Sequence, residues 1–428
     1  MQIGSVIQGF QLLDIREVPD LQGVFYEMEH VKTGAKLGWM KNNDENKTFS
    51  ITFKTIPKNS TGVFHILEHS VLQGSRNYPG KAPYVEMLKT SLNTFLNAMT
   101  FSDKTMFPIS SRNKKDFENL VNIYMDAVFF PKLLEEENIF LQEGWHYEFE
   151  KEGNVPVFNG VVLNEMRGAN STVDSLMDDF MAEALFPDTG YGFVSGGNPD
   201  EIVDLTYEEF KNTHKKVYHP SNSIIYLDGD LEIDKMLELL DTKYLSYFDK
   251  KEVDWSFKFQ TPTNGRHLNK EYAVLKKGKK DGYLGVGYGI GKFCDLKKIS
   301  IARILADYLT DSNEAVLTKA ILSKDLGGDI SAFVNDGVYQ PYIHFVIKNT
   351  NSKENEKVEE FLQDTLKKVY EKGLDKNQLL ALLDRLEFFS KERDYGGDPM
   401  GLTNAFMVME NWLYGGDPIE RLEIDKYF

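Results

Sequence analysis

The order in which strand-like and helix-like segments follow one another is the strongest constraint on the fold. Residues 21–56 contain short apolar–polar alternations separated by the turn-forming stretches TGAK and NNDENK, which predict antiparallel strands. Helical periodicity then follows in residues 63–74, 82–99, 114–129 and 199–218. Because strands and helices come in mixed order, the sequence predicts an α+β fold and not a doubly wound parallel sheet.

An internal similarity predicts how the chain divides. Residues 91–133 follow the order strand, strand, polar turn, long helix, and residues 329–374 repeat that order. For 428 residues and a usual domain size of about 150, we expect two homologous domains, each a mainly antiparallel sheet packed with helices. The polar stretch Asp249–Asn269 has no helical period and is the expected linker. The predicted division is therefore a first domain over 1–250, a linker over 251–270 and a second domain over 271–428.

Composition excludes several classes of function. The chain has 49 Lys and Arg against 66 Asp and Glu, a net charge of −17, and its basic residues are scattered, which argues against nucleic-acid binding. No apolar run approaches the ~18 residues of a membrane span. The acidity suits cationic peptides or serves solubility alone. The single cysteine, Cys294, is expected to be a small core residue. Without a visible signal or transit segment at the start, the sequence predicts a cytoplasmic protein.

The stretch FHILEHS carries the most specific chemical signal. At about 100° per residue, His65, Glu68 and His69 share one face of a helix. Two histidines at positions i and i+4 can hold one Zn²⁺, and the glutamate between them can take a proton from water without being a ligand. The order H-x-x-E-H is the inverted form of H-E-x-x-H. The alternative is a helix whose histidines are only capped or solvated.

A catalytic zinc of this kind needs a third protein ligand and an open fourth position. Glu165 in FNGVVLNEMRGAN is the natural choice, because it follows a short apolar run and begins a helix-like stretch. The sequence contains 66 acids, so spacing alone does not select it.

The residues from Gly62 to Pro131, together with VVLNEMRG and YHPSN further on, resemble the insulinase/pitrilysin family of zinc peptidases in its presequence-protease and falcilysin branch. The resemblance runs from about residue 20 to the end. It implies Zn²⁺ held by His65, His69 and Glu165, with Glu68 as the general base of a direct hydrolysis. The second predicted domain carries no H-x-x-E-H motif.

The resemblance also implies a substrate class and a way of holding it. Related enzymes hold an unstructured peptide as an added strand on a sheet edge, and the matching segment is LNAMT, where Asn97 and Ala98 would supply main-chain pairing. An equal alternative for Asn97 is a turn or buried-amide role. The expected function is thus a zinc-dependent endopeptidase that cleaves unstructured peptides of limited length.

Two departures from the family pattern qualify this expectation. Some branches carry an acid seven residues before the third ligand, and this chain has Phe158 there. Family members of this branch are about twice as long, and their second half closes over the first and contributes an Arg and a Tyr. The expected partner is therefore a second, C-terminal half. The rival functions are a half that binds zinc and peptide but is inactive without that partner, and a purely structural subunit.

Other motifs receive structural interpretations. Three Gly-Gly-Asn/Asp-Pro stretches, at 196–199, 396–399 and 415–418, are interpreted as helix starts without a chemical role. The glycines of GYLGVGYGIGK, at positions 285, 287, 289 and 291, predict the close approach of a helix to a strand. His146, His219 and His344 are expected to be structural.

Overall fold

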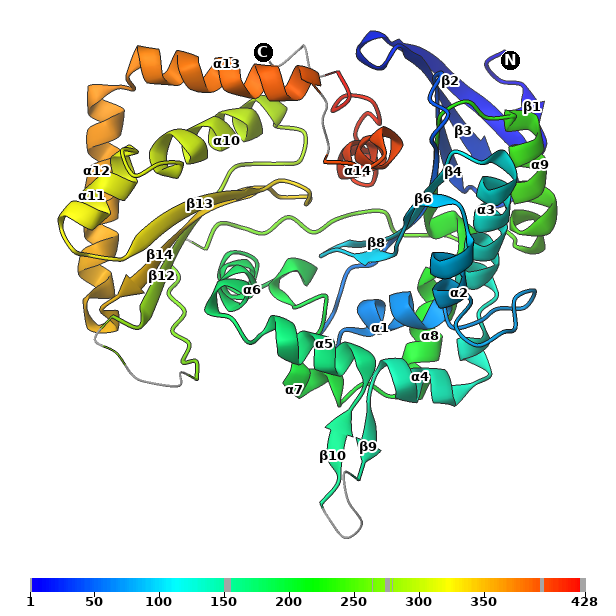
Figure 1. Cartoon of the computed structure of the whole chain (residues 1–428), viewed down its shortest axis with the longest axis horizontal. Coiled ribbons are helices and arrows are strands. Elements are labelled where there is room, and N and C mark those ends of the chain that lie inside the picture. Colours follow the sequence, from blue (N-terminus) through cyan, green and yellow to red (C-terminus); the bar gives the residue numbers. More distant parts are fainter. Residues whose placement is uncertain are drawn as a thin grey trace. The chain divides into compact units, whose positions relative to one another are not determined.

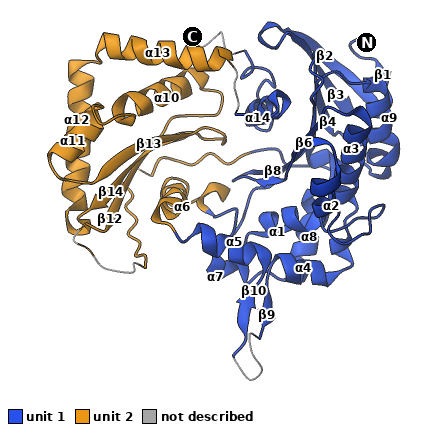
Figure 2. Ribbon diagram, in the orientation of Figure 1, with its two compact units in different colours: residues 1–171, 193–256, 395–425 blue, residues 172–192, 257–394, 426–428 orange. Residues whose placement is uncertain are grey.

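The computed structural model describes residues 2–149, 155–263, 265–273, 278, 280–392 and 396–423. The chain forms two compact units, coloured in Figure 2. Unit 1 contains residues 1–171, 193–256 and 395–425, and unit 2 contains residues 172–192, 257–394 and 426–428. Each unit combines a largely antiparallel sheet with helices, so the predicted α+β class is confirmed.

Unit 1 is built on a nine-stranded sheet with the strand order β1-β2-β3-β4-β11-β5-β8-β6, in which β7 also pairs with β8. The strands are β1 (Val6–Ile7), β2 (Phe10–Val18), β3 (Gly23–His30), β4 (Lys36–Lys41), β5 (Lys47–Lys54), β6 (Asn93–Leu96), β7 (Met99–Thr100), β8 (Lys104–Ser111) and β11 (Ser223–Asp228). Neighbours are antiparallel except β11 and β4. The strands expected in residues 21–56 are present as β3, β4 and β5.

Helices cover both faces of this sheet, which explains why its central strands are buried throughout. The helices of unit 1 are α1 (Val63–Val71), α2 (Pro83–Thr90), α3 (Lys114–Phe129), α4 (Glu137–Glu143), α5 (Val161–Ala169), α7 (Pro199–Ile202), α8 (Tyr207–Val217), α9 (Ile233–Lys243) and α14 (Met400–Trp412). Along β5, Phe49, Ile51 and Phe53 enter the main core, whereas a Cβ on Gly401 of α14 would meet the alternate residue Thr48. Figure 1 shows α3 and α9 on one side of the sheet and α14 on the other.

The predicted helix over 82–99 is too long. Helix α2 ends at Thr90, and the following residues form β6 and β7. Strand β6 pairs with β8 through Asn93 and Leu96, which face Ser111 and Ile109. The tertiary partner β8 therefore overrides a local pattern that also suits a helix.

Unit 2 contains a three-stranded antiparallel sheet with the order β12-β14-β13. Its strands are β12 (Gly282–Gly289), β13 (Asp329–Asn335) and β14 (Tyr342–Thr350), and its helices are α6 (Val173–Leu185), α10 (Leu296–Thr310), α11 (Val316–Ser323), α12 (Asn355–Lys372) and α13 (Lys376–Glu392). Residues 329–374 have the predicted order, with β13, β14, a turn and α12. Residues 91–133 differ from the prediction, because three strands, β6, β7 and β8, precede α3 where two were expected.

Helix α6 packs closely on the glycine face of β12, as the sequence predicts. A Cβ on Gly285 would stand 2.6 Å from Met181 Sδ, and a Cβ on Gly287 would stand 2.5 Å from Met181 Cε and 3.0 Å from Leu185 Cδ1. Gly289 lies outside this contact, because no atom lies within 4 Å of its Cβ position. The missing side chains on β12 make room for the large apolar side chains of α6.

The two compact units depart from the predicted residue ranges in two places. Residues 172–192, which carry α6, fall in unit 2 although they lie within the predicted range 1–250. Residues 395–425, which carry α14, fall in unit 1 although they lie within 271–428. Each helix packs on the sheet of the unit that it joins. Such a tertiary contact cannot be detected from composition, which was the basis of the predicted boundary.

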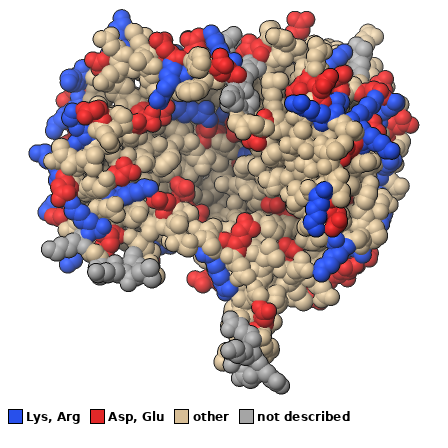
Figure 3. Space-filling view, in the orientation of Figure 1, with Lys and Arg blue, Asp and Glu red and all other residues tan. Residues whose placement is uncertain are grey.

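The segment expected to be a linker has no helix or strand in its described residues, which exclude Asn264. Most of its described residues are exposed or half-buried, but Gln260 is 3% exposed and hydrogen-bonds with Asp188 and Gln340. Among the described helices, none combines the length and apolarity needed to cross a bilayer. On the face seen in Figure 3, acidic and basic side chains are interspersed, in keeping with the scattered charges of the sequence.

Candidate metal centre

The H-x-x-E-H motif lies on α1 in unit 1. The helix begins after Gly62, whose φ is 67°. A Cβ at this position would stand only 2.7 Å from the carbonyl oxygen of Gly196, so only glycine can occupy position 62 this close to the other backbone segment. His65, Glu68 and His69 each offer one ligand atom, and these atoms lie within 4.8 Å of one another. The three side chains therefore share one face of the helix, as the spacing predicts.

Glu165 on α5 places a second carboxylate next to the two imidazoles. Its Oε1 atom lies 3.6 Å from Nε2 of His65, and its Oε2 atom lies 3.6 Å from Nε2 of His69. In a tetrahedral site with bonds of about 2.0–2.1 Å, neighbouring ligand atoms stand about 3.3 Å apart. Each imidazole stands at nearly this separation from the Glu165 carboxylate, and two imidazoles with one carboxylate are a donor set that suits Zn²⁺. The Glu165 side chain is 51% exposed, so the site opens to solvent on that side.

The second nitrogen of each histidine has its own partner. Nδ1 of His65 lies 2.9 Å from the carbonyl oxygen of Gly196, and Nδ1 of His69 lies 3.3 Å from Oε2 of Glu143. Because both partners are acceptors, each Nδ1–H donates and each Nε2 lone pair is left facing Glu165. Such partners orient metal-binding imidazoles and fix their tautomer.

Glu143, at the end of α4, contacts His69, and the sequence did not single it out. It is 2% exposed, and its Oε1 atom accepts hydrogen bonds from the side-chain amides of Gln73 (2.8 Å) and Gln142 (2.7 Å). It places a carboxylate next to a histidine of the site, whereas some branches of the family carry an acid at the position of Phe158. Phe158 itself meets the Trp145 ring edge to face, with the ring centroids 5.6 Å apart. No local pattern distinguishes Glu143 from the other acids of the chain, because its role depends on the packing of α4 beside α1.

Burial and neighbouring charges set the protonation of these groups. Burial raises the pKa of Glu68 to about 7, although His69 and a hydrogen bond from Thr100 act to lower it. Burial also lowers the pKa of His65. For His69, burial acts to lower the pKa, but the hydrogen bond to Glu143 and the surrounding acids outweigh it and raise the pKa overall. In the metal-free site, Glu68 therefore holds a proton more readily than an exposed glutamate does.

The segment LNAMT lies at the sheet edge beside α1, with Asn97 and Ala98 between β6 and β7. The Asn97 N–H donates to Pro108 O (3.3 Å), and its carbonyl oxygen accepts from the Tyr124 hydroxyl (3.1 Å). The main-chain pairing expected from Asn97 is thus already used within the unit. Among the residues that the structure describes, neither the N–H nor the C=O of Ala98 has a hydrogen-bond partner.

The three Gly-Gly-Asn/Asp-Pro stretches differ in structure. Asn198 caps α7 with its side chain, as predicted, but Gly196 in the same stretch also orients His65, so the expectation of no chemical role is wrong there. Pro399 directly precedes α14. The third stretch begins no helix: the Asp417 side chain accepts from the backbone N–H of Ile419 within a turn.

Cys294 is exposed, so the expectation of a core residue is wrong. Its apolar neighbours in the sequence point inward, whereas Cys294 lies in the loop between β12 and α10. The remaining histidines of interest have local roles. Nδ1 of His146 pairs with Leu141 O (2.6 Å), Nδ1 of His219 accepts from the backbone of Ser221, and His344 is buried in β14.

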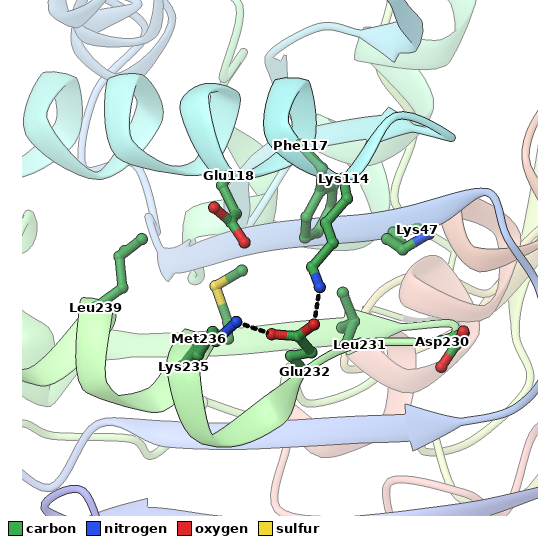
Figure 4. Close-up of a pocket in the computed structure, with 10 residues that line it drawn as sticks. All are labelled: Lys47, Lys114, Phe117, Glu118, Asp230, Leu231, Glu232, Lys235, Met236 and Leu239. Atoms are coloured by element: carbon green, nitrogen blue, oxygen red, sulfur yellow. Dashed lines mark hydrogen bonds and ion pairs between the residues drawn. The ribbon is translucent and has the colours of Figure 1, made fainter.

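A cavity of about 400 Å³ lies between α3 and α9. None of the metal-site residues lines it. Its floor is apolar, and Figure 4 shows Glu232 at its rim paired with Lys114 and Lys235. Because its rim mixes both signs of charge in ion pairs, the cavity presents no defined ligand chemistry.

Comparison with known proteins identifies related sequences across the chain. The family model for "Insulinase (Peptidase family M16)" matches residues 56–156, and that for "Peptidase M16 inactive domain" matches residues 204–386. Protein HypA of Clostridium perfringens is 43% identical over 425 residues, which cover 99% of this chain and 44% of that protein. Presequence protease 1, chloroplastic/mitochondrial, of Arabidopsis thaliana is 38% identical, over 97% of this chain and 39% of that protein. This chain thus spans less than half the length of the curated relatives that it matches.

Solved structures show the same fold. Pitrilysin matches with a TM-score of 0.65 and 15% identity, over 98% of this chain and 44% of that chain. A protease from Helicobacter pylori matches with a TM-score of 0.64 and 16% identity, over 92% of this chain and 90% of that chain. At these identities, the likeness concerns the fold alone.

Proposed function

This chain belongs to the insulinase/pitrilysin (M16) family of peptidases, in its presequence-protease-like branch, and from this premise we propose that it is the catalytic half of a zinc-dependent endopeptidase that hydrolyses unstructured peptides. The observation that carries the proposal is the meeting of His65, His69 and Glu165 at ligand spacing, with the buried carboxylate of Glu68 beside them. A helix with a purely structural role does not require two oriented imidazoles and two carboxylates at one place.

Each residue has a separate role in this proposal. His65, His69 and Glu165 would hold the metal, and the chemistry that Zn²⁺ supplies when bound is polarisation of the scissile carbonyl and of the attacking water. Glu68 takes a proton from that water and returns it to the leaving amine, so no covalent acyl-enzyme forms. Burial raises the pKa of Glu68 to about 7 in the metal-free site, and bound Zn²⁺ would lower it.

The substrate would bind along the sheet edge that carries Ala98. Its unpaired N–H and C=O can extend the sheet by one strand, and main-chain pairing of this kind reads no side chains. Only a peptide with a free backbone can pair in this way, and this geometry supports unstructured peptides as substrates. The predicted cytoplasmic location stays a prediction.

The second candidate function is a half that binds zinc and peptide but needs a partner half for turnover. The length of the relatives favours it, since this chain covers only 44% of the HypA protein and 39% of the Arabidopsis presequence protease.

One experiment separates these functions. Zinc content is measured by mass spectrometry, and cleavage is measured with a quenched unstructured peptide, for the wild-type chain, for Glu68→Gln and for the control Glu371→Gln on the exposed surface of α12. We expect zinc in all three proteins and cleavage lost only in Glu68→Gln. A wild-type chain without bound zinc would overturn the proposal. Zinc and peptide binding without cleavage would favour the half-enzyme.

A further inference from the structure

Thr100 contacts the proposed general base, and nothing in the H-x-x-E-H motif assigns it a role. It is the second residue of the short edge strand β7, which lies against α1. Its hydroxyl donates a hydrogen bond to Oε2 of Glu68 at 3.1 Å. Among the described residues, this is the one hydrogen bond to the Glu68 carboxylate. Glu68 is 7% exposed, so solvent offers that carboxylate little alternative support.

We propose that Thr100 is a positioning residue for the general base, an inference that rests on the proposed function. Rotation about the last torsion of a glutamate is broad and only roughly two-fold, so packing alone does not fix the plane of its carboxylate. The hydroxyl of Thr100 holds Oε2 and thereby fixes that plane. Oε1 of Glu68 is then the oxygen that receives the proton of the attacking water.

The β7–β8 hairpin holds Thr100 at a fixed place. Thr100 pairs with Thr105 of β8. The hydroxyl of Thr105 is buried and hydrogen-bonds with the hydroxyl of Thr55 at 2.9 Å. The turn between the strands is closed by the bond from Phe101 N to Lys104 O, at 2.8 Å. Thr100 therefore stands on a braced strand and not on a loose loop.

Residues about 300 positions further along the chain complete this brace. Asp103, in the hairpin turn, is fully buried and accepts hydrogen bonds from the Tyr414 hydroxyl at 2.6 Å and from Lys104 Nζ at 3.2 Å. The Phe101 ring meets the Phe406 ring of α14 edge to face, with the ring centroids 6.0 Å apart. The C-terminal segment of unit 1 thus helps to hold the hairpin that presents Thr100.

The test compares three variants of the full chain: Thr100→Val, which keeps the shape and removes the hydroxyl; Thr100→Ser, which keeps the hydroxyl; and Thr242→Val, a control on the exposed side of α9. Because a misplacement of about 1 Å can slow catalysis about 100-fold, we expect kcat for Thr100→Val to fall by about 10- to 100-fold. KM and zinc content should stay within about twofold of wild type. Thr100→Ser should keep kcat within about threefold of wild type. The kcat of Thr242→Val should equal that of wild type.

Two results would overturn the role of Thr100 while leaving the peptidase intact: wild-type kcat in Thr100→Val, or an equal loss in Thr100→Ser. Failure of the proposed function looks different, because the wild-type chain then lacks zinc or lacks cleavage that depends on Glu68. In that case crystal structures of wild type and Thr100→Val still decide the inference. A Glu68 carboxylate that rotates away in the variant supports it, and an unchanged Glu68 refutes it.

Discussion

Replacement of Glu143 by glutamine tests how the metal site is oriented. In the wild type, one oxygen of Glu143 accepts from Gln73 and Gln142, and the other accepts from Nδ1 of His69. A glutamine has only one oxygen. If that oxygen stays with the two amides, the glutamine NH₂ group faces Nδ1 of His69 and favours the tautomer with hydrogen on Nε2. The Nε2 atom then has no lone pair for a metal. If the amide flips, its NH₂ group faces two other donors.

Either orientation should weaken zinc binding by Glu143→Gln. Loss of such an outer partner typically costs 10- to 100-fold in metal affinity, which corresponds to about 1.4–2.7 kcal/mol. The assay is competition for Zn²⁺ with a chromophoric chelator at pH 7.5. Glu137→Gln, at the exposed start of the same helix, is the matched control and should bind zinc as the wild type does. A zinc affinity for Glu143→Gln equal to that of the wild type would refute the reasoning.

Three further predictions concern pH and backbone geometry. Burial raises the pKa of Glu68 to about 7, and the base acts when it is deprotonated, so kcat/KM should rise with pH along an acidic limb. Because bound Zn²⁺ would lower that pKa, the midpoint of the limb should lie at or below about pH 7. A flat profile from about pH 5 to about pH 8 would contradict this. Gly62→Ala should destabilise unit 1 by about 1–3 kcal/mol in urea unfolding and weaken zinc binding. The alanine would have to adopt a positive φ, and its Cβ would collide with the backbone of Gly196. Gly80→Ala is the control, because a Cβ at that position meets open space. Gly287→Val should lower the unfolding free energy of unit 2 by about 1–3 kcal/mol by pushing α6 off β12, and an unchanged melting curve would argue against that packing.

Local patterns predicted those parts of the site that lie on a single element. His65, Glu68 and His69 are within one helical turn of each other, so helix geometry alone brings them to one face. The close contact of α6 with β12 was visible as a strip of glycines, because a strand places alternate residues on one face.

Parts of the site that depend on packing between distant segments left no such signal. Glu143 and Gly196 orient the two histidines from positions far along the chain, and each belongs to a residue type that is abundant in the sequence. Thr100 was visible only as the last letter of LNAMT. Cys294 was misassigned because apolar neighbours in sequence do not determine which way a loop residue points.

The sequence by itself determined the α+β class, the helix that carries the H-x-x-E-H motif and, through resemblance, the family. These features rest on the periodicity of single elements, which the backbone geometry imposes wherever the element lies. Only the tertiary structure decided which carboxylate orients His69, which hydroxyl holds Glu68, and which unit each of α6 and α14 joins. Those outcomes depend on contacts between residues up to hundreds of positions apart. Such contacts form only when the chain has folded, because burial of apolar faces and pairing of buried polar groups bring distant segments together.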